Sequence, residues 1–380
     1  MKIGIVCPYN LFRHGGVQET VFAHQRVLRA RGHQVKIISP RPLSFEGKPP
    51  RDVILVGLST DLNYPFKTKA DVSIKIGLAE LKTLLDNEHF DILHFHEPWV
   101  PLFPRQLLNM SSSINVGTFH AKWPERLIYR TFGKAIRPYA RSIANDLDYI
   151  VAASVPASYY INELLETSVP VIYNGIDLKL YNPTKVRPLK KYADDRKLIL
   201  YINRLEKRKG PDLLLKAYRE LVRTEPDVRL VIASDGDMRD KLEAYALKYQ
   251  LPGVEFLGFV SQATKIRLYK SADVYCAPSP YGEGFGIVLL EAMAMQVPYV
   301  AGDNVGYRLA SGARANNYLV DPTDTKKFAR QLKTMLTDQT ARASYKKWSR
   351  AQAAKHDYES IVSQYEQVYK ALVNEHAKKT

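Results

Sequence analysis

The sequence predicts an α/β protein built from two doubly wound domains. Three observations support this: strand-length apolar runs alternate with helical segments, the alternation starts again after the turn signal Asn174-Gly175-Ile176-Asp177, and 380 residues exceed what one such domain needs. We expect an N-terminal domain over residues 1–172, with a C-terminal helix over 356–380 that packs back onto it. We expect a second domain over 173–355 and a nucleotide site facing the cleft between the two.

Composition and charge restrict the classes of function. The chain is 46% hydrophobic and 25% charged, as in ordinary globular proteins, and its formal net charge is +16. Such a charge favours anionic partners: nucleic acid, acidic lipid head groups or phosphorylated substrates. Only two cysteines occur, Cys7 and Cys276, and no run approaches the ~20 apolar residues of a membrane-spanning helix. We therefore expect an intracellular protein in a reducing compartment, with peripheral membrane contact at most.

The N-terminal domain is expected to begin with a strand, a glycine-containing loop and a helix. The helix carries Val17, Val21 and Leu28 on one face and ends at Gly32. The pair Gly15-Gly16 lies outside the carboxyl end of the first strand, where a doubly wound sheet binds phosphate groups, although plain turn chemistry would also explain it. The strands expected in this domain cover residues 2–8, 34–39, 52–58, 91–96, 114–120, 149–154 and 169–174.

Three histidines lie at the carboxyl ends of two of these strands. His94 and His96 end one strand and His120 ends the next, on the side where such sheets bind ligands. Because side chains alternate along a strand, His94 and His96 point to one face and Phe95 to the other. Hydrogen-bonded structural histidines would give the same pattern, so a ligand contact is one of two interpretations.

A long helix or a helix pair is expected over residues 123–144, with a bend at Pro138. Basic residues recur on it at three- and four-residue steps, so they form one stripe: Arg126, Arg130, Lys134, Arg137 and Arg141. The stripe is either a solvated charged face or a surface for anionic lipid or another polyanion.

The second domain carries basic residues directly after its first strand. Arg204 and Lys209 precede Gly210 and a helix, and a planar guanidinium with a lysine point charge suits a diphosphate; a basic surface loop is the alternative. Val260 and the nearby Lys265 follow another strand and either edge a base-binding slot or belong to a core strand and its turn. The strands expected here cover residues 198–202, 229–233, 254–257, 274–277 and 299–301.

The most informative stretch is Gly282-Glu283-Gly284-Phe285-Gly286, which leads into an apolar helical run over residues 287–295. Glycines before a helix let backbone N–H groups approach an anion, and the helix N-terminus favours negative charge. Glu283 and Glu291 lie eight positions apart, roughly 80° on a helix, so they need not share a face and do not form an acid/base pair. Two hydroxyl-rich groups flanking a phosphate, as in a nucleotide sugar, fit better. An ordinary strand-to-helix connection is the alternative.

These motifs together resemble the family 4 retaining glycosyltransferases of the GT-B fold, in which two doubly wound Rossmann-like domains face a cleft. The stretch from Glu283 to Glu291 resembles the family's Glu-x7-Glu motif. Arg204 with Lys209-Gly210, Asn174-Gly175-Ile176-Asp177 and Gly15-Gly16-Val17-Gln18 fall where the family has matching motifs. Within the family, the sequence is most similar to bacterial phosphatidylinositol mannosyltransferases, at residues 6–9, 15–18, 96–98, 118–120, 272–278 and 285–289.

The resemblance implies a nucleotide-sugar donor such as GDP-mannose and a role for each matching residue. Arg204, Lys209 and the Gly16 backbone would hold the diphosphate, Glu291 the ribose, and Val260 with Lys265 the base. Glu283 and His120 would contact the donor sugar, so the catalytic set is His120, Glu283, Arg204 and Lys209. The remaining donor-binding positions are Gly284, Phe285, Gly286 and Ile287. Tyr9 and Gln18 match positions near a polyol acceptor.

Two departures from those mannosyltransferases leave the acceptor lipid open. Residues 76–82 lack the basic cluster that those enzymes carry on the helix after the third strand. The acceptor loop at residues 62–65 reads Leu-Asn-Tyr-Pro rather than a Tyr-Asn-Gly-Ser type.

We therefore expect a retaining hexosyltransferase that moves mannose from GDP-mannose to a lipid-linked polyol such as phosphatidylinositol. It would act in the cytoplasm, peripherally associated with the inner face of the cell membrane. The leaving diphosphate would be stabilised electrostatically and would itself take the acceptor's proton, so no protein base is required. No tightly bound cofactor is predicted. No protein metal ligand is predicted either, because no plausible loop carries an Asp-x-Asp pattern; Mg²⁺ without protein ligands remains open.

Other functions remain open on the sequence. One is a UDP-glucose-dependent transferase with a different lipid or a soluble acceptor. An epimerase of sugar nucleotides or a phosphorylase with pyridoxal phosphate would use the same architecture. A basic nucleic-acid binder is disfavoured, because the positive charge is dispersed and no aromatic-basic RNA-binding signature occurs.

Overall fold

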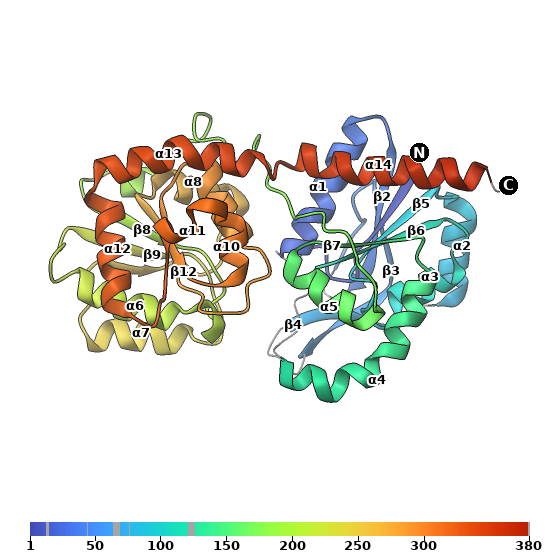
Figure 1. Cartoon of the computed structure of the whole chain (residues 1–380), viewed down its shortest axis with the longest axis horizontal. Coiled ribbons are helices and arrows are strands. Elements are labelled where there is room, and N and C mark those ends of the chain that lie inside the picture. The colour runs from blue at the N-terminus through green and yellow to red at the C-terminus, as the bar shows by residue number, and fades with distance from the viewer. Residues whose placement is uncertain (13–14, 44, 64–68, 76, 121–125, 379–380) are drawn as a thin grey trace. The chain divides into compact units, whose positions relative to one another are not determined.

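The computed structural model divides the chain into two compact units, which Figure 1 traces from the N-terminus to the C-terminus. It describes residues 1–12, 15–43, 45–63, 69–75, 77–120 and 126–378, and for residues 59–63, 69–75 and 126–135 it describes the backbone only. Unit 1 comprises Met1–Gly175 and Tyr358–Thr380, and unit 2 comprises Ile176–Asp357. The sequence analysis predicted the corresponding domain boundaries at residues 172 and 355.

Unit 1 contains a seven-stranded sheet in the order β4-β3-β2-β1-β5-β6-β7. Neighbouring strands are parallel except for β3 and β4, which are antiparallel. Six strands lie where the sequence predicts them. The sequence analysis missed β4, although residues 69–75 alternate between polar and apolar types. The strands are β1 Lys2–Val6, β2 Gln34–Pro42, β3 Val53–Asn63, β4 Lys69–Lys75, β5 Ile92–His96, β6 Ile114–Phe119 and β7 Tyr149–Ala152.

The strand predicted over residues 169–174 does not form. A single bridge joins Val171 to Ala152 of β7. The Ala152 N–H donates to the Pro170 carbonyl at 2.9 Å, and the Ile172 N–H donates to the Ala152 carbonyl at 3.0 Å. Pro170 has no N–H of its own, so it cannot extend a ladder. The segment therefore passes the sheet edge as irregular chain.

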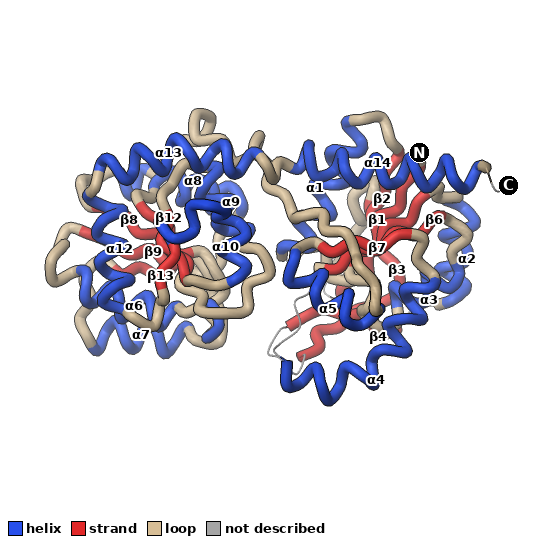
Figure 2. The backbone as a smooth tube through the Cα atoms, viewed as in Figure 1, coloured by secondary structure: helices blue, strands red, loops and turns tan. Residues whose placement is uncertain are grey.

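Helices cover both faces of the sheet in unit 1 (Figure 2). On one face, α1 and α14 pack against β1 and β2, with Tyr365 and Tyr369 of α14 buried. On the other face, Phe95 of β5 packs with Leu81 of α2 and Phe103 of α3, as the predicted alternation along β5 requires. The helices are α1 Gly16–Ala30, α2 Leu78–Glu88, α3 Phe103–Met110, α4 Arg126–Asn145, α5 Val155–Leu165 and α14 Tyr358–Ala377.

Two of these helices refine the sequence-based expectations. The long basic helix is a single element, α4, that contains Pro138. The C-terminal helix expected over residues 356–380 is α14, which belongs to unit 1, whereas the preceding helix, α13 Gln339–Ala354, belongs to unit 2. Among the helices that the structure describes, none combines the length and the apolar character needed to cross a membrane.

Unit 2 contains a six-stranded parallel sheet in the order β10-β9-β8-β11-β12-β13. Its first five strands lie where the sequence predicts them, and the sequence analysis missed the two-residue β13. The strands are β8 Lys197–Tyr201, β9 Val228–Ile232, β10 Val254–Phe256, β11 Val274–Ala277, β12 Tyr299–Gly302 and β13 Leu319–Val320. The helices are α6 Pro211–Leu221, α7 Arg239–Lys248, α8 Gln262–Ser271, α9 Ile287–Ala294, α10 Val305–Ser311, α11 Ala315–Tyr318, α12 Thr325–Thr337 and α13.

Each sheet reverses its strand order at one point. In unit 1 the chain builds outward from β1 to β4 and then returns to add β5 on the other side of β1. In unit 2 it builds from β8 to β10 and returns to add β11 on the other side of β8. Ligands of doubly wound sheets bind beyond the carboxyl ends of the strands at such a switch point. The loops after β1, β5, β8 and β11 are therefore the places to examine.

Candidate active site

In unit 2, the loops after β8 and β11 bring Lys209 and Glu283 together. The Lys209 Nζ lies 2.6 Å from Glu283 Oε1, and both residues are buried. Burial alone raises the pKa of Glu283, but the attraction of Lys209 outweighs it, so the pKa of this carboxyl lies below its ordinary value. Two of the predicted catalytic residues thus form one buried ion pair.

Gly210 lets these two loops approach each other. It follows the short 3₁₀ turn Lys207–Lys209 and has φ = 67°, in the left-handed region. A Cβ at this position would lie 2.2 Å from the carbonyl oxygen of Pro278, just after β11. A side chain is therefore excluded by both conformation and space, and the glycine fixes Lys209 against the end of the neighbouring strand.

Arg204 and Arg208 add two guanidinium groups beside the ion pair. Glu206 bridges them: its Oε1 lies 2.7 Å from Arg204 Nη1, and its Oε2 lies 3.0 Å from Arg208 Nε. Arg208 also reaches Glu283, at 4.0 Å. With Lys209, these groups place three cations against two carboxylates, so the cluster carries one positive charge in excess. The sequence analysis missed Arg208 and Glu206 as site residues, although both stand between Arg204 and Lys209 in the chain.

The glycine loop leads into α9 as predicted. Gly282 and Gly286 have φ values of 82° and 102°, and Gly286 caps the N-terminus of α9. A Cβ on Gly286 would lie 2.6 Å from the ring of Tyr307. The side chain of Phe285 is buried and packs on the ring of His356, 5.0 Å away between centroids. Phe285 therefore offers its backbone, not its ring, to a ligand at this helix end.

Glu291 occupies a different environment from Glu283. It is 1% exposed, and its carboxylate accepts hydrogen bonds from Tyr181, Tyr269 and Lys265. The two glutamates therefore have separate sets of partners. Lys265 lies on α8, whose N-cap residue Ser261 directly follows Val260; of the two predicted base contacts, Lys265 pairs with Glu291. Nothing in the sequence analysis pointed to the two tyrosines.

In unit 1, the predicted histidines meet in a buried hydrogen-bonded group. His96 Nδ1 lies 2.8 Å from His120 Nε2, and His94 contacts the Thr118 hydroxyl at 2.7 Å and the Tyr369 hydroxyl at 2.6 Å. A further histidine, His24 of α1, packs against His96, with 5.4 Å between ring centroids. The sequence offered one indication that His24 belongs to this group. His24 lies four residues after Thr20, so both side chains lie on the same face of α1, which is buried.

Burial keeps these histidines uncharged. It lowers the pKa of His24 to about 3 and that of His120 to about 4, and it lowers the pKa of His94 and His96 well below the ordinary value. The other histidines of the group lower the pKa values of His24, His94 and His96 further. The group is therefore a set of neutral imidazoles, which both donate and accept hydrogen bonds.

The loop after β5 also contacts the backbone of His120. The Glu97 Oε1 in this loop accepts a hydrogen bond from the backbone N–H of His120 at 2.6 Å. Glu97 itself has φ = 53°, a conformation that non-glycine residues adopt only when their contacts require it. The geometry thus links the end of β5 to the end of β6.

His24, His94 and His96 are the described residues whose side chains could hold a metal ion. One ring nitrogen from each lies within 4.8 Å of the others. Both nitrogens of His94, however, already contact Thr118 and Tyr369, and Thr118 in turn donates to Tyr365 at 3.1 Å. A metal ion would have to displace one of these contacts, so the arrangement fits a neutral hydrogen-bonded core under α14 better than a metal centre.

Of the two predicted acceptor residues, Tyr9 lies in the loop after β1 and Gln18 lies in the first turn of α1. The Gln18 Nε2 donates to the Asn10 carbonyl at 3.1 Å, and the Ser39 hydroxyl donates to the Tyr9 carbonyl at 2.9 Å. A Cβ on Gly15 would lie 2.4 Å from Gln18 Oε1. Gly15 thus adjoins the flexible end of the Gln18 side chain at the start of α1, where Gly16 is the first helical residue.

The basic stripe on α4 is partly neutralised. Arg137 Nη1 lies 2.7 Å from Glu166 Oε1, and Arg141 pairs with the other oxygen of the same carboxylate. Two of the five stripe residues therefore share one negative charge. The side chains of Arg126, Arg130 and Lys134 lie outside the described residues.

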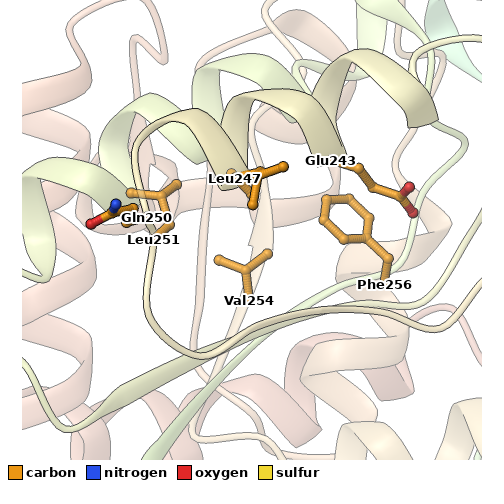
Figure 3. A pocket seen from close by; sticks show the side chains of 7 residues that line it. Glu243, Leu247, Gln250, Leu251, Val254 and Phe256 are labelled. Carbon is orange, nitrogen blue, oxygen red and sulfur yellow. The ribbon is translucent and has the colours of Figure 1, made fainter.

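A hollow of about 320 Å³ on unit 2 lies away from these groups (Figure 3). Side chains of α7 and the edge strand β10 line it, among them Leu247, Val254 and Phe256. No predicted site residue is among its lining residues. We therefore do not assign the donor to it.

Comparisons with known proteins bear on the family and the fold of this chain. The family described as Glycosyltransferase Family 4 matches residues 14–180, and the family described as Glycosyl transferases group 1 matches residues 184–352. Phosphatidyl-myo-inositol mannosyltransferases of Mycobacterium tuberculosis and Mycolicibacterium smegmatis are 32% and 33% identical to this sequence. The alignments cover 100% and 98% of this chain, and 99% and 94% of those proteins.

Solved structures with the same fold include two at low sequence identity. The sucrose-phosphate synthase of Thermosynechococcus elongatus aligns with a TM-score of 0.75 at 20% identity, over 98% of each chain. Anabaena HepE, solved in complex with UDP and glucose, aligns with a TM-score of 0.73 at 20% identity, over 97% of this chain and 99% of its own. These likenesses bear on the fold alone.

Proposed function

Since this chain belongs to the family 4 glycosyltransferases of the GT-B fold, we propose that it transfers mannose from GDP-mannose, with retention of configuration, to phosphatidylinositol or a similar lipid-linked polyol. The full-length similarity to phosphatidyl-myo-inositol mannosyltransferases supports the sugar and the acceptor class. The chemistry of the two groups of site residues supports the assignment of roles.

The cluster around Lys209 is the observation that carries the proposal. A nucleoside diphosphate brings several negative charges, and Arg204, Arg208 and Lys209 offer three cations against the two carboxylates of the cluster. Arginine binds phosphate oxygens in pairs and lysine as a point charge. The N-terminus of α9 adds backbone N–H groups after Gly286.

In the proposed reaction, the bond between the anomeric carbon and the diphosphate oxygen breaks while the acceptor hydroxyl bonds to the anomeric carbon on the same face. The acceptor proton passes to the departing phosphate oxygen, so protons and charges balance without a protein base. Arg204 and Lys209 stabilise the negative charge that develops on the leaving group. Glu283, held by Lys209, and His120 contact hydroxyl groups of the donor sugar.

The other proposed roles are those that the resemblance to the family implies. Glu291 accepts hydrogen bonds from the ribose hydroxyls, and Val260 with Lys265 contact the base. Tyr9 and Gln18 contact the polyol acceptor. Mg²⁺ would accompany the donor without protein ligands. The basic stripe of α4 contacts anionic lipid, which places the protein at the inner face of the cell membrane as a peripheral enzyme.

The first experiment is a thermal-denaturation panel with GDP, UDP, ADP, GDP-mannose and UDP-glucose. A ligand that binds only the folded state stabilises it by about 2.7 kcal/mol at 100 times its Kd. We expect GDP and GDP-mannose to raise the unfolding midpoint most. A shift with UDP and UDP-glucose alone would transfer the proposal to the UDP-glucose-dependent alternative, and no shift with any of them would overturn the donor site.

A second experiment tests the transfer itself. The protein is incubated with labelled GDP-mannose and vesicles that contain phosphatidylinositol, and the lipid product is analysed by NMR for the configuration at the anomeric carbon. We expect a mannosylated lipid with the configuration of the donor. Conversion of the sugar nucleotide without acceptor would instead identify an epimerase.

A further inference from the structure

Glu291 is held by three hydrogen-bond donors from two segments of unit 2. The Tyr181 hydroxyl lies 2.7 Å and the Lys265 Nζ 2.5 Å from its Oε1, and the Tyr269 hydroxyl lies 2.9 Å from its Oε2. Tyr181 precedes β8, whereas Tyr269 and Lys265 belong to α8. Glu291 itself lies on α9.

The surrounding contacts set the direction of both tyrosine hydrogen bonds. The Gln262 side-chain N–H donates to the Tyr181 oxygen at 3.0 Å, so the Tyr181 hydrogen points to Glu291. The Tyr269 hydroxyl has a second acceptor, the Val288 carbonyl, at 3.3 Å. Its contact with the Glu291 carboxylate is shorter, and a charged acceptor forms the stronger bond.

The two tyrosines are fixed, whereas Lys265 is not enclosed to the same extent. Both tyrosine side chains are fully buried, and their rings pack edge to face at 6.3 Å. The Tyr181 backbone is anchored as well, because Arg350 donates to its carbonyl at 2.9 Å. The Lys265 side chain is 18% exposed, and its ammonium group is carried on a flexible aliphatic stem. The tyrosines therefore supply geometry, and the lysine supplies countercharge.

We propose that Tyr181 and Tyr269 are positioning residues for ribose recognition: they hold the Glu291 carboxylate in the orientation that accepts the ribose hydroxyls of the donor. This rests on the proposed function, in which Glu291 contacts the ribose. A carboxylate has about four acceptor positions, and the three donors leave one open on Oε2. Without the tyrosines, Glu291 would turn on its side-chain bonds, and the ribose would meet a carboxylate without fixed direction.

The test compares nucleotides with and without the ribose hydroxyls. The dissociation constants of GDP and 2′,3′-dideoxy-GDP, and of UDP and 2′,3′-dideoxy-UDP, are measured by calorimetry for the wild type, Tyr181→Phe and Tyr269→Phe. The wild type is expected to bind its nucleotide about tenfold more tightly than the dideoxy form, as loss of a hydrogen bond to a charged group requires. In each variant the preference should fall to about threefold or less, with the dideoxy affinity unchanged.

Tyr345→Phe is the matched control. Tyr345 lies on α13 of the same unit and is fully buried, and no described residue forms a hydrogen bond with its hydroxyl. The same loss of an oxygen from a buried tyrosine should leave both affinities unchanged there. The unfolding midpoint of each variant, measured alongside, identifies any loss of folded protein.

The remaining outcomes overturn the inference in distinguishable ways. Equal weakening of both nucleotide forms would mean that the tyrosines only maintain the fold, and unchanged preferences would mean that they do not orient Glu291. If the wild type binds GDP or UDP no more tightly than the dideoxy form, Glu291 does not contact the ribose, but the proposed glycosyl transfer is unaffected. A wild type that binds neither nucleotide would overturn the proposed function as well.

Discussion

The two units share one architecture and place opposite chemistry at corresponding strand ends. Unit 1 has 23 Lys and Arg against 18 Asp and Glu, a net charge of +5, and unit 2 has 32 against 21, a net charge of +11. At the ends of β5 and β6, unit 1 gathers neutral histidines with tyrosine and threonine hydroxyls. Unit 2 gathers a buried ion pair, Lys209 with Glu283, and a partly buried one, Lys265 with Glu291.

Under the proposed function, this difference lets one fold serve two kinds of ligand. The topological switch point fixes where a ligand binds in each unit, whereas the residues in the loops decide which ligand it is. Neutral groups that donate and accept hydrogen bonds suit the hydroxyls of sugars and polyols. Paired charges with an excess cation suit a diphosphate. The predictions below test whether this division between neutral and charged chemistry is real.

The largest expected effect comes from breaking the buried ion pair in unit 2. Lys209→Met leaves the buried Glu283 with Arg208, 4.0 Å away, as its remaining countercharge, which should lower the free energy of unfolding of unit 2 by about 3 kcal/mol. Hydrogen exchange followed by mass spectrometry measures this on unit 2 peptides. The double variant Lys209→Met with Glu283→Gln should recover part of the loss, because no charge is then left unpaired.

Lys216→Met is the control for that experiment. Lys216 is exposed on α6 and should change the stability by less than about 0.5 kcal/mol. If Lys209→Met lowers the free energy of unfolding as little as this control does, the ion pair does not stabilise unit 2, and the contrast between the units fails.

The next effect is a change in turnover with little change in the stability of the fold. Arg204→Ala removes a cation from the proposed leaving-group site and should lower kcat by about 10²–10³, the loss seen when one stabilising donor is removed. The side chain is 45% exposed and pairs at the cluster rim with Glu206, so the unfolding midpoint should change little. Arg223→Ala, an exposed arginine paired with Glu220, should leave turnover unchanged. Near-normal turnover in Arg204→Ala would remove Arg204 from the catalytic set.

A third effect separates the units by pH. The pKa of His24 is about 3 in the folded protein, below its ordinary value of 6.5, so this histidine costs no stability above about pH 6.5, and the cost grows as the pH falls towards 3. At pH 5 one such histidine costs about 2 kcal/mol. Among the described residues, unit 1 contains four histidines with lowered pKa values, whereas unit 2 contains His356, whose pKa burial lowers to about 4.

Unit 1 should therefore lose more hydrogen-exchange protection than unit 2 between pH 7 and pH 5, after correction for the intrinsic exchange rate. The stabilising contribution of the Glu283 carboxyl is complete above its ordinary pKa of 4.5 and is lost only below it, outside this window. His24→Leu should reduce the pH dependence of unit 1 peptides and leave unit 2 unchanged. Equal losses in the two units would contradict the contrast drawn above.

The smallest effect concerns the stripe on α4. Glu166→Gln removes the carboxylate shared by Arg137 and Arg141, so binding to vesicles with anionic lipid should strengthen by a few fold, on the order of 1 kcal/mol. Co-sedimentation at two salt concentrations measures it, and neutral vesicles serve as the control. An unchanged affinity would mean that unit 1 does not contribute this stripe to a membrane surface.

The fold was predictable from the sequence because its signals are local. Apolar runs of strand length and the turn chemistry at Gly32 and Gly175 predicted eleven strands that the structure contains. The two missed strands and the false one at residues 169–174 are all at sheet edges, where pairing depends on a partner rather than on the pattern. Pro170 decided the last case, since it cannot donate to a ladder.

The sequence by itself determined which loops carry chemistry: the cations after β8, the glycine–glutamate loop before α9 and the histidines at the ends of β5 and β6. Tertiary structure alone decided their partners. Tyr181 meets Glu291 across 110 positions of chain, His24 enters the histidine group from α1, and Arg208 joins Arg204 through Glu206. Short-range patterns fix dihedral angles and buried faces, but a hydrogen bond or ion pair between distant residues forms only when packing brings their segments together.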